Sequence, residues 1–159
     1  MGEYAAEIPR TLQRQQAAVV QGLRRGAVLC KAEVVREINA TRPHPPVDLG
    51  EMRRSYVITP LPTGARLENV APHAAHQEFG TRPFSAPKSV LLAWAGRKVR
   101  GGGGGKGGRR AAQHALAMKA WLAIRRGGIK PKLFHTRASQ RFDAIVQRAV
   151  LDALRRVTS

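Results

Sequence analysis

The stretch L-E-N-V-A-P-H-A-A-H-Q-E-F-G-T-R-P-F-S-A-P, residues Leu67 to Pro87, holds a local signal for each change of backbone direction that it predicts. Residues 67–71 alternate between two faces, which is typical of the end of a strand. Pro72 suits the first turn of a helix, because the first N–H groups of a helix have no partner within it. Gly80 stands where a glycine with positive φ commonly ends a helix. The stretch therefore predicts a strand end, a short helix over residues 73–79 and a sharp exit.

The exit from this short helix is predicted to be extended, because Pro83 excludes the helical region for the residue before it. Within the helix we expect Ala74, Ala75 and Phe79 to share the inward side. The residues around Gly80 are therefore predicted to form a fixed corner. These corner residues are Glu78, Phe79, Gly80, Thr81, Arg82 and Pro83.

An antiparallel hairpin is predicted over residues 55–71. Ser55 to Thr59 reads as the first strand, Pro60 to Gly64 as the turn, and Ala65 to Ala71 as the return strand. Two strands alone are marginally stable, so the hairpin needs a third strand or a helix against it. Residues 129–134, which Pro131 keeps extended, could supply that strand. Upstream, Asp48 and Glu51 are spaced as a capping box for a short turn with Met52 inward.

Along the chain, a long helix is predicted before this hairpin and another near the C-terminus, with the helices laid on one face of the sheet. Apolar residues recur every three or four positions from Leu12 to Ile38, which predicts a helix over Pro9 to Asn39 with Pro9 in its first turn. Phe142 to Val157 carries a second apolar stripe, with Thr136 or Ser139 as the cap. The opposite side of this last helix holds Arg141, Arg148, Arg155 and Arg156. The fold class is therefore predicted as α+β, a small antiparallel sheet packed against a long N-terminal helix and a C-terminal helix in one domain over residues 1–159.

The middle of the chain predicts two further helices and a flexible loop. One helix covers residues 86–99, and a second covers 110–126, with Ala111, Ala115, Met118, Leu122 and Arg125 along one side and Gly127-Gly128 as its end. Between them G-G-G-G-G-K-G-G, residues 101–108, is predicted to be a flexible connector. It is not a phosphate-binding loop, since that motif needs a glycine at position 100 and Ser or Thr at position 107.

Positive charge is the unusual feature of the composition. The 159 residues carry 28 Lys and Arg against 10 Asp and Glu, a formal net charge of +18. Residues 97–159 hold 16 basic and 2 acidic side chains, so most of the field belongs to the second half. Such a field attracts polyanions, and we expect nucleic acid or an acidic protein face as the neighbour. The expected contacts are Arg97, Lys98, Arg100, Lys106, Arg109, Arg110, Arg125 and Arg126.

Catalytic and cofactor chemistry are not predicted. His73, His76 and Glu78 are close in sequence, but a metal site needs three or four converging ligands and the other histidines lie in unrelated segments. The serines, histidines and acids form no nucleophile motif or carboxylate pair, so we expect no enzyme and no cofactor. Cys30 is predicted to be a small core residue. Residues 1–8 do not resemble a secretory signal and no apolar run is long enough to span a membrane, so an intracellular, soluble chain is expected.

The motif A-P-x-A-A-x-x-E-F-G-T-R-P-F, preceded by D-L-G-E-M-R-R-S-Y-V-I and followed by I-K-P-K-L-F, resembles the tail-completion or neck family of long-tailed bacteriophages. The resemblance covers most of the chain from Val47 onward, and Glu78 to Pro83 is its most specific part. It implies a structural virion protein that joins tail to head as a homo-oligomeric ring, with sixfold symmetry, around the DNA channel. Its implied partners are the adjoining connector or stopper, the tail terminator or tail tube proteins, and genomic DNA. The implied location is the virion, after assembly in the host cytoplasm.

Two hypotheses from different classes follow. The first is this assembly protein, in which the hairpin and the corner make the ring body, residues 78–83 form a subunit interface, and the basic half faces DNA or an acidic neighbouring ring. The second is a basic nucleic-acid-binding module that acts alone. The few aromatic residues mostly fit core positions, so no base-stacking platform is visible for the second hypothesis. A discrete cyclic oligomer would favour the first, and a monomer or dimer that binds DNA would favour the second.

Overall fold

The computed structural model describes residues 2–41, 50–99 and 106–158. These residues fall into two compact units, one made of residues 1–74 with 133–159 and the other of residues 75–132. The first unit is α+β, as predicted, with a two-stranded antiparallel sheet packed against long helices. The second unit is helical. The prediction that residues 1–159 form one domain stays a prediction.

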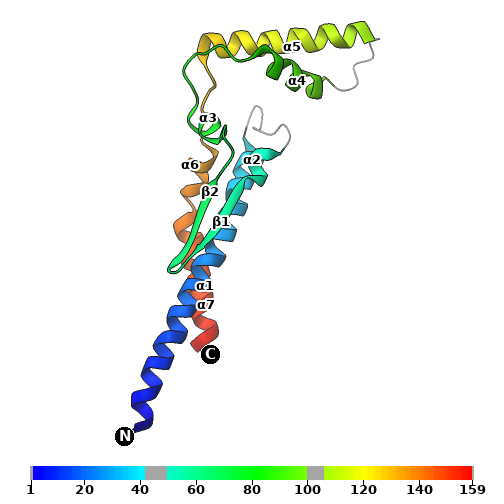
Figure 1. Cartoon of the computed structure of the whole chain (residues 1–159). Helices are drawn as coiled ribbons and strands as arrows, with labels where there is room; N and C mark the ends of the chain where they lie inside the picture. Colours follow the sequence, from blue (N-terminus) through cyan, green and yellow to red (C-terminus); the bar gives the residue numbers. More distant parts are fainter. Residues whose placement is uncertain (1, 42–49, 100–105, 159) are drawn as a thin grey trace. The chain divides into compact units, whose positions relative to one another are not determined.

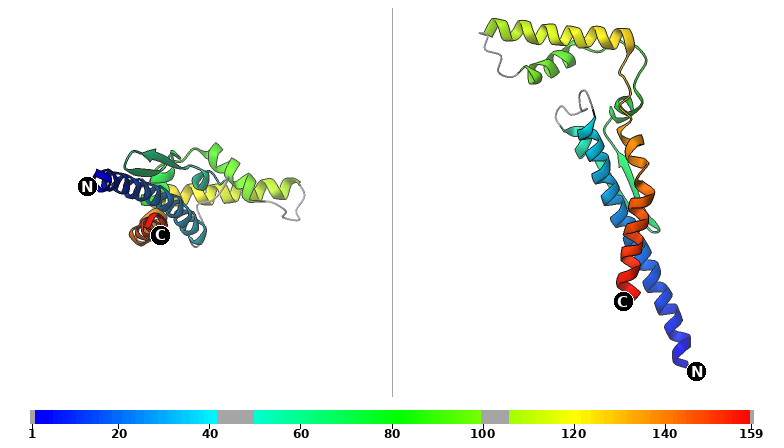
Figure 2. Two further views of the ribbon diagram at one scale, coloured as in Figure 1. Left: turned by 90° about the horizontal axis from the view of Figure 1, so that it is seen from below. Right: turned by 180° about the vertical axis from the view of Figure 1, so that it is seen from behind.

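Two antiparallel helices form the frame of the first unit. Figures 1 and 2 show α1 (Gly2–Ala40) and α7 (Phe142–Thr158) side by side. Gly22 and Gly26 permit this close approach, because a Cβ on Gly22 would lie 2.6 Å from the Val150 Cα and one on Gly26 would lie 3.2 Å from the Val146 Cα. These two glycines are therefore part of the contact surface of α1 with α7. The predicted apolar stripe of α7 is confirmed, with Ala149 at its buried centre.

The hairpin consists of β1 (Tyr56–Leu61) and β2 (Gly64–Asn69), with Tyr56 opposite Asn69 and Leu61 opposite Gly64. The predicted hairpin is confirmed, but its turn is shorter than expected. Pro60 lies within β1 opposite Ala65, where it is tolerated because each strand of a two-stranded sheet has an unpaired edge. The possible third strand is not formed within the described residues: residues 129–133 have no regular secondary structure and join no sheet, and Phe134 begins a helix.

The core of the first unit gathers residues from every part of it. Val34 and Ile38 of α1 pack with Met52 of α2 (Glu51–Arg54), Tyr56 of β1 and Phe134 of α6 (Phe134–Ser139). All five side chains are at most 2% exposed. Met52 is therefore inward, as predicted. The helices thus replace the third strand as the cover of the hairpin.

Three predicted helix boundaries in this unit are wrong. Pro9 lies inside α1, which begins at Gly2. The last helix is two helices: α6 starts after Leu133, whose φ is 51°, and ends at Ser139, before α7 begins at Phe142. Thr136 and Ser139 therefore lie within α6 rather than at a cap. The residue before α2 is Gly50, whose φ is 75° and which provides no side-chain cap. The predicted cap, Asp48, lies outside the described residues.

The second unit contains most of α3 (Ala74–Phe79), together with α4 (Lys88–Lys98) and α5 (Lys106–Gly127). The short helix and both longer helices are confirmed. α5 begins earlier than predicted, so Gly107 and Gly108 are helical and the rest of the predicted loop, residues 101–105, lies outside the described residues. Of the residues predicted along one side of α5, Ala111, Ala115 and Leu122 are exposed, whereas Ala117, outside that set, is only 4% exposed.

Candidate interaction sites

The predicted corner is held by hydrogen bonds between two segments of the second unit. The Thr81 N–H donates to the Ile129 carbonyl oxygen at 2.9 Å, and the Ile129 N–H donates to the Thr81 hydroxyl oxygen at 3.0 Å. The Lys132 N–H donates to the Gln77 carbonyl oxygen at 2.9 Å. Hydrogen bonds thus join residues 77–82 to residues 128–132 at two places, Thr81 with Ile129 and Gln77 with Lys132. We refer to these two segments together as the corner.

Glycines allow the two segments to approach. Gly80 has a φ of 76°, and a Cβ on it would lie 2.5 Å from the Ile129 carbonyl oxygen. Gly128 has a φ of 70°, and a Cβ on it would overlap the Thr81 carbonyl oxygen. Positive φ is strained for residues with a side chain, and neither position has room for one. Each segment of the corner therefore depends on a glycine where the other segment comes close.

The corner exposes an aromatic ring. Phe79 is 70% exposed and Ala75 is also exposed, so their predicted inward position is wrong, whereas Glu78 is 5% exposed. An open cavity of about 400 Å³ lies beside the ring, with Arg82 and Lys130 on its walls. Its lining brings together four of the six predicted corner residues, Phe79, Gly80, Thr81 and Arg82, with Gly127, Ile129, Lys130 and Pro131. Pro83 and the buried Glu78 are not part of the lining.

Residues 127–131 were missed as part of this site by the sequence reasoning, which read them as a helix stop and a strand. The signal that could have found them is Gly128 followed by Pro131. The spacing between this glycine and this proline is the same as that between Gly80 and Pro83. Two such exits in one chain are consistent with two segments that cross and fix each other.

The second candidate site is the pair of basic helices α4 and α5. Residues 75–132 hold 13 of the 28 Lys and Arg residues but only one acidic residue, Glu78, which gives the unit +12 of the total +18. Because Glu78 is buried, the described surface of this unit presents no exposed carboxylate. The positive charge that the sequence assigned to the second half is thus concentrated in this unit.

The eight predicted basic contacts do not form one cluster. Arg97 and Lys98 end α4, while Arg109 and Arg110 lie in the first two turns of α5. Arg125 and Arg126 lie in the last turn of α5, about 22 Å along the helix from Arg110 at 1.5 Å per residue. Arg100 lies outside the described residues, and of Lys106 only the helical backbone is described. Sequence reasoning missed Lys88, Lys119 and Lys130, which are exposed in the same unit.

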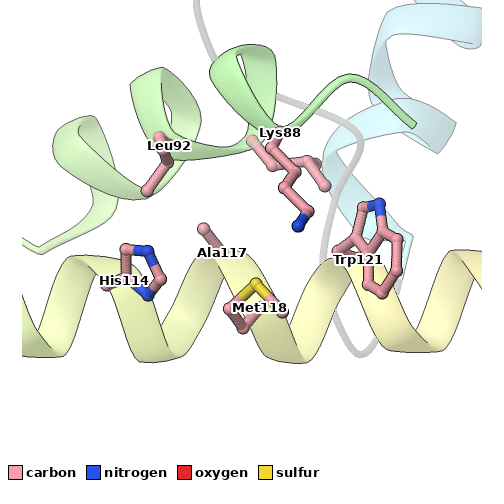
Figure 3. A pocket seen from close by; sticks show the side chains of 7 residues that line it. Lys88, Leu92, His114, Ala117, Met118 and Trp121 are labelled. Carbon is pink, nitrogen blue, oxygen red and sulfur yellow. The ribbon is translucent and has the colours of Figure 1, made fainter. Parts of the chain in front are cut away.

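A cation–π arrangement joins α4 to α5. The Lys88 ammonium lies 5.0 Å and the Arg125 guanidinium 4.9 Å from the ring centroid of Trp121. Figure 3 shows Lys88 and Trp121 at one end of a cavity of about 20 Å³ between these helices. That volume is about the size of one water molecule, so the cavity is a packing gap and not a ligand site. Trp121 therefore acts as a fixed support for two cations.

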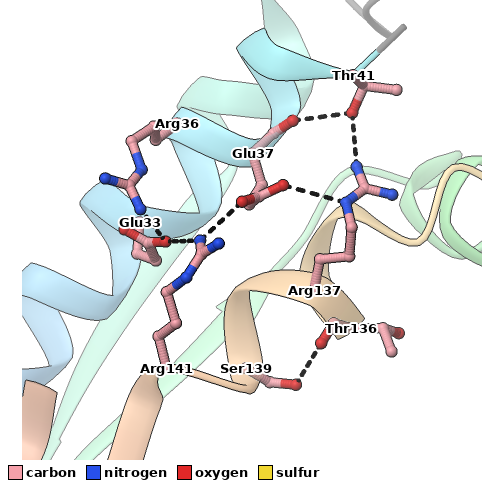
Figure 4. A network of polar contacts seen from close by, with 8 residues as sticks. All are labelled: Glu33, Arg36, Glu37, Thr41, Thr136, Arg137, Ser139 and Arg141. Carbon is pink, nitrogen blue, oxygen red and sulfur yellow. Dashed lines mark hydrogen bonds and ion pairs between the residues drawn. The ribbon is translucent and has the colours of Figure 1, made fainter. Parts of the chain in front are cut away.

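A separate ionic network belongs to the first unit and has a structural role (Figure 4). Arg141, which lies directly before α7, bonds both Glu33 and Glu37, with 2.8 Å between its Nη1 and the Glu37 Oε1. Arg36 and Arg137 bond the same carboxylates at 2.6 and 3.1 Å. Burial by itself would raise the pKa of Glu33, but its hydrogen bonds from Arg141 and Arg36 outweigh burial and lower that pKa. Hydrogen bonds from Arg141 and Arg137 likewise lower the pKa of Glu37.

Cys30 lies next to this network and is 4% exposed, which confirms it as a core residue. Its burial raises the pKa of the thiol, and the negative charge of Glu33 adds to the rise. Among the described residues, no group of three or more His, Cys, Asp or Glu side chains could hold a metal ion. No helix in the described ranges has the length and apolar character required to cross a membrane.

No family model, no curated protein and no solved structure matches the chain.

Proposed function

We propose that this chain is a structural protein of the bacteriophage neck, a tail-completion or head–tail joining subunit that forms a ring around the DNA channel. The resemblance of residues 78–83 to that family supports the proposal. The observation that carries it is the geometry of the corner. Paired hydrogen bonds hold its two segments together, two glycines permit their close approach, and Phe79 is exposed beside Arg82 and Lys130.

An exposed aromatic ring on a rigid loop is suited to a protein interface. Aromatic residues and arginine are enriched where protein surfaces meet, and a few such anchors supply most of the binding energy. Phe79 loses little conformational freedom when a neighbour covers it, because its backbone is already held. In the proposed ring, the neighbour is the next copy of this chain or a subunit of an adjoining ring.

Replacing Phe79 with Ala tests this role. In a phage that carries the gene, Phe79→Ala should lower the yield of infectious particles about tenfold or more, because loss of an interface anchor typically costs about 2 kcal/mol or more. Val90→Ala is the matched control, since Val90 is also an exposed apolar residue of the second unit, at 60% exposure.

Circular dichroism of the purified chain should show that both variants fold, because truncation of exposed side chains away from special contacts changes stability by about 0.5 kcal/mol or less. A wild-type yield from Phe79→Ala would remove the corner from the proposal.

A second function, a basic nucleic-acid-binding module acting alone, is favoured by the +12 charge of residues 75–132. The two functions differ in the size of the protein at work. A ring subunit forms a closed oligomer, alone or on its neighbouring ring, whereas the module binds DNA as a monomer or dimer.

A further inference from the structure

The exposed side of α5 carries a pattern of its own. Residues at spacings of three and four lie on one face of a helix, and five such residues of α5 are all exposed. They lie opposite the face that includes the buried Ala117. The five residues, which we call the outer face of α5, are Ala112, Ala115, Lys119, Ala123 and Arg126.

This face is smooth, cationic and without a carboxylate. Three of its five residues are alanines, whose small side chains let a partner approach the helix backbone. Lys119 and Arg126 lie two turns apart on it, and Arg109, Arg110 and Arg125 add exposed cations at the two ends of α5. Because the one acidic residue of this unit is buried, none of these cations faces an exposed acid of the unit. The face therefore presents charge that no exposed carboxylate of its own unit neutralises.

We infer that the outer face of α5, with the cations at its two ends, binds the phosphate backbone of double-stranded DNA without reading the base sequence. α5 has 22 residues and is about 33 Å long, close to one turn of duplex DNA at about 34 Å. Cations spread over that length can reach several phosphates on one side of a duplex, and each neutralised phosphate releases counterions.

Double-stranded DNA fits this face better than a single strand does. Single strands are held by aromatic rings on which bases stack. The tryptophan of α5, Trp121, has Lys88 and Arg125 over its ring at 5.0 and 4.9 Å, so its ring is already in use. The outer face itself carries no aromatic residue. Charge without a stacking surface is typical of contact with the duplex backbone.

The same features make an acidic protein a weaker candidate. Protein interfaces usually combine charge with an apolar centre, whereas this face offers alanines and cations over the length of the helix. This inference depends on the proposed function only for the setting, which is the DNA that crosses the neck. The binding itself can be measured on the isolated chain, so its failure is separate from the failure of the proposed function.

The test is binding of a fluorescent 30-base-pair duplex of random sequence, measured by anisotropy over a range of salt concentrations. The double variant Lys119→Gln, Arg126→Gln should bind about tenfold or more weakly near 0.1 M salt, and its slope of log affinity against log salt should be shallower by about 2. The matched control is Arg148→Gln, Arg156→Gln, which removes the same charge from exposed positions of α7. The control should change affinity less than about threefold.

Each other outcome overturns the inference. An equal loss in the control would show that net charge alone attracts DNA. Tighter binding of a single strand of the same length would replace the duplex as the ligand. Competition by poly-glutamate as effective as that by duplex of equal charge would indicate an acidic protein partner. Unchanged duplex affinity in the Lys119, Arg126 variant would place the contact elsewhere.

Discussion

Gly80 occupies a position in the corner that does not tolerate a side chain. Its φ of 76° and the carbonyl of Ile129, 2.5 Å from where a Cβ would lie, each oppose any other residue there. The corner holds Phe79 at the surface only if this backbone is kept. Adding a single methyl group at Gly80 should therefore strain the corner.

We predict that Gly80→Ala lowers the free energy of unfolding by about 2 kcal/mol or more, from the strain of positive φ together with the overlap. Gly96→Ala is the matched control: Gly96 lies inside α4, and the nearest group to an added Cβ is the Gln113 side chain at 4.0 Å. The control should be neutral or more stable by up to about 1 kcal/mol, because alanine favours helix. Urea unfolding followed by circular dichroism compares the two, and equal stabilities would refute the described corner.

Around Gly80, the backbone conformation was predictable from the sequence, but the direction of the neighbouring side chains was not. The positive φ of Gly80 was predictable, because a glycine directly after a helical run has a local cause. The sides taken by Glu78 and Phe79 were not predictable. A helix of six residues is too short for periodicity to define its inward face, and the face is set by contact with residues 128–132, about fifty residues away.

At the scale of elements, the ion network links α1 to α6 and α7. Glu33 and Glu37 lie on one side of α1 and accept hydrogen bonds from Arg137 of α6 and from Arg141, directly before α7. Both carboxyl groups have lowered pKa values in the folded chain. A carboxyl group whose pKa is lower in the folded than in the unfolded state stabilises the fold when ionised.

We predict that this stabilisation is fully present above the unfolded pKa of about 4.3 and is lost as pH falls through the lowered folded values. The double variant Glu33→Gln, Glu37→Gln should have a Tm about 3–6 °C lower at pH 7, because it loses charged hydrogen bonds. Its Tm should then fall less than that of the wild type between pH 5 and pH 3. Thermal unfolding at pH 7, 5, 4 and 3 measures this, and parallel pH profiles for the two proteins would be the contrary result.

Elements with a strong period were predictable and elements decided by distant contacts were not. The stripes of the first and last helices gave α1 and α7, and alternation gave the hairpin. The buried face of α5 was not predicted, because its many alanines make two opposite sides look equally apolar. The third strand failed because residues 129–133 find their hydrogen-bond partners at Gln77 and Thr81 rather than in a sheet. The role of Gly22 and Gly26 depends on α7, more than a hundred residues away.

For the whole molecule, the location of the positive charge was predicted well, whereas the division of the chain into two compact units was not predicted. The sequence placed the positive field in the second half, and most of it belongs to residues 75–132. The packing of the C-terminal helix in the first unit was predicted, but the separation of residues 75–132 as a second compact unit was not, since local periodicity does not say which helix pairs with which. The functional proposal combines a local motif at residues 78–83 with this division of charge.

The central claim is that the chain is a building block of a phage particle. Quantitative mass spectrometry of purified, DNA-filled particles from the phage that encodes it tests this most directly. The proposal predicts that the chain is present at about six copies per particle, as a closed ring requires. Its absence from finished particles, with the other tail and head proteins at their normal amounts, would contradict the claim.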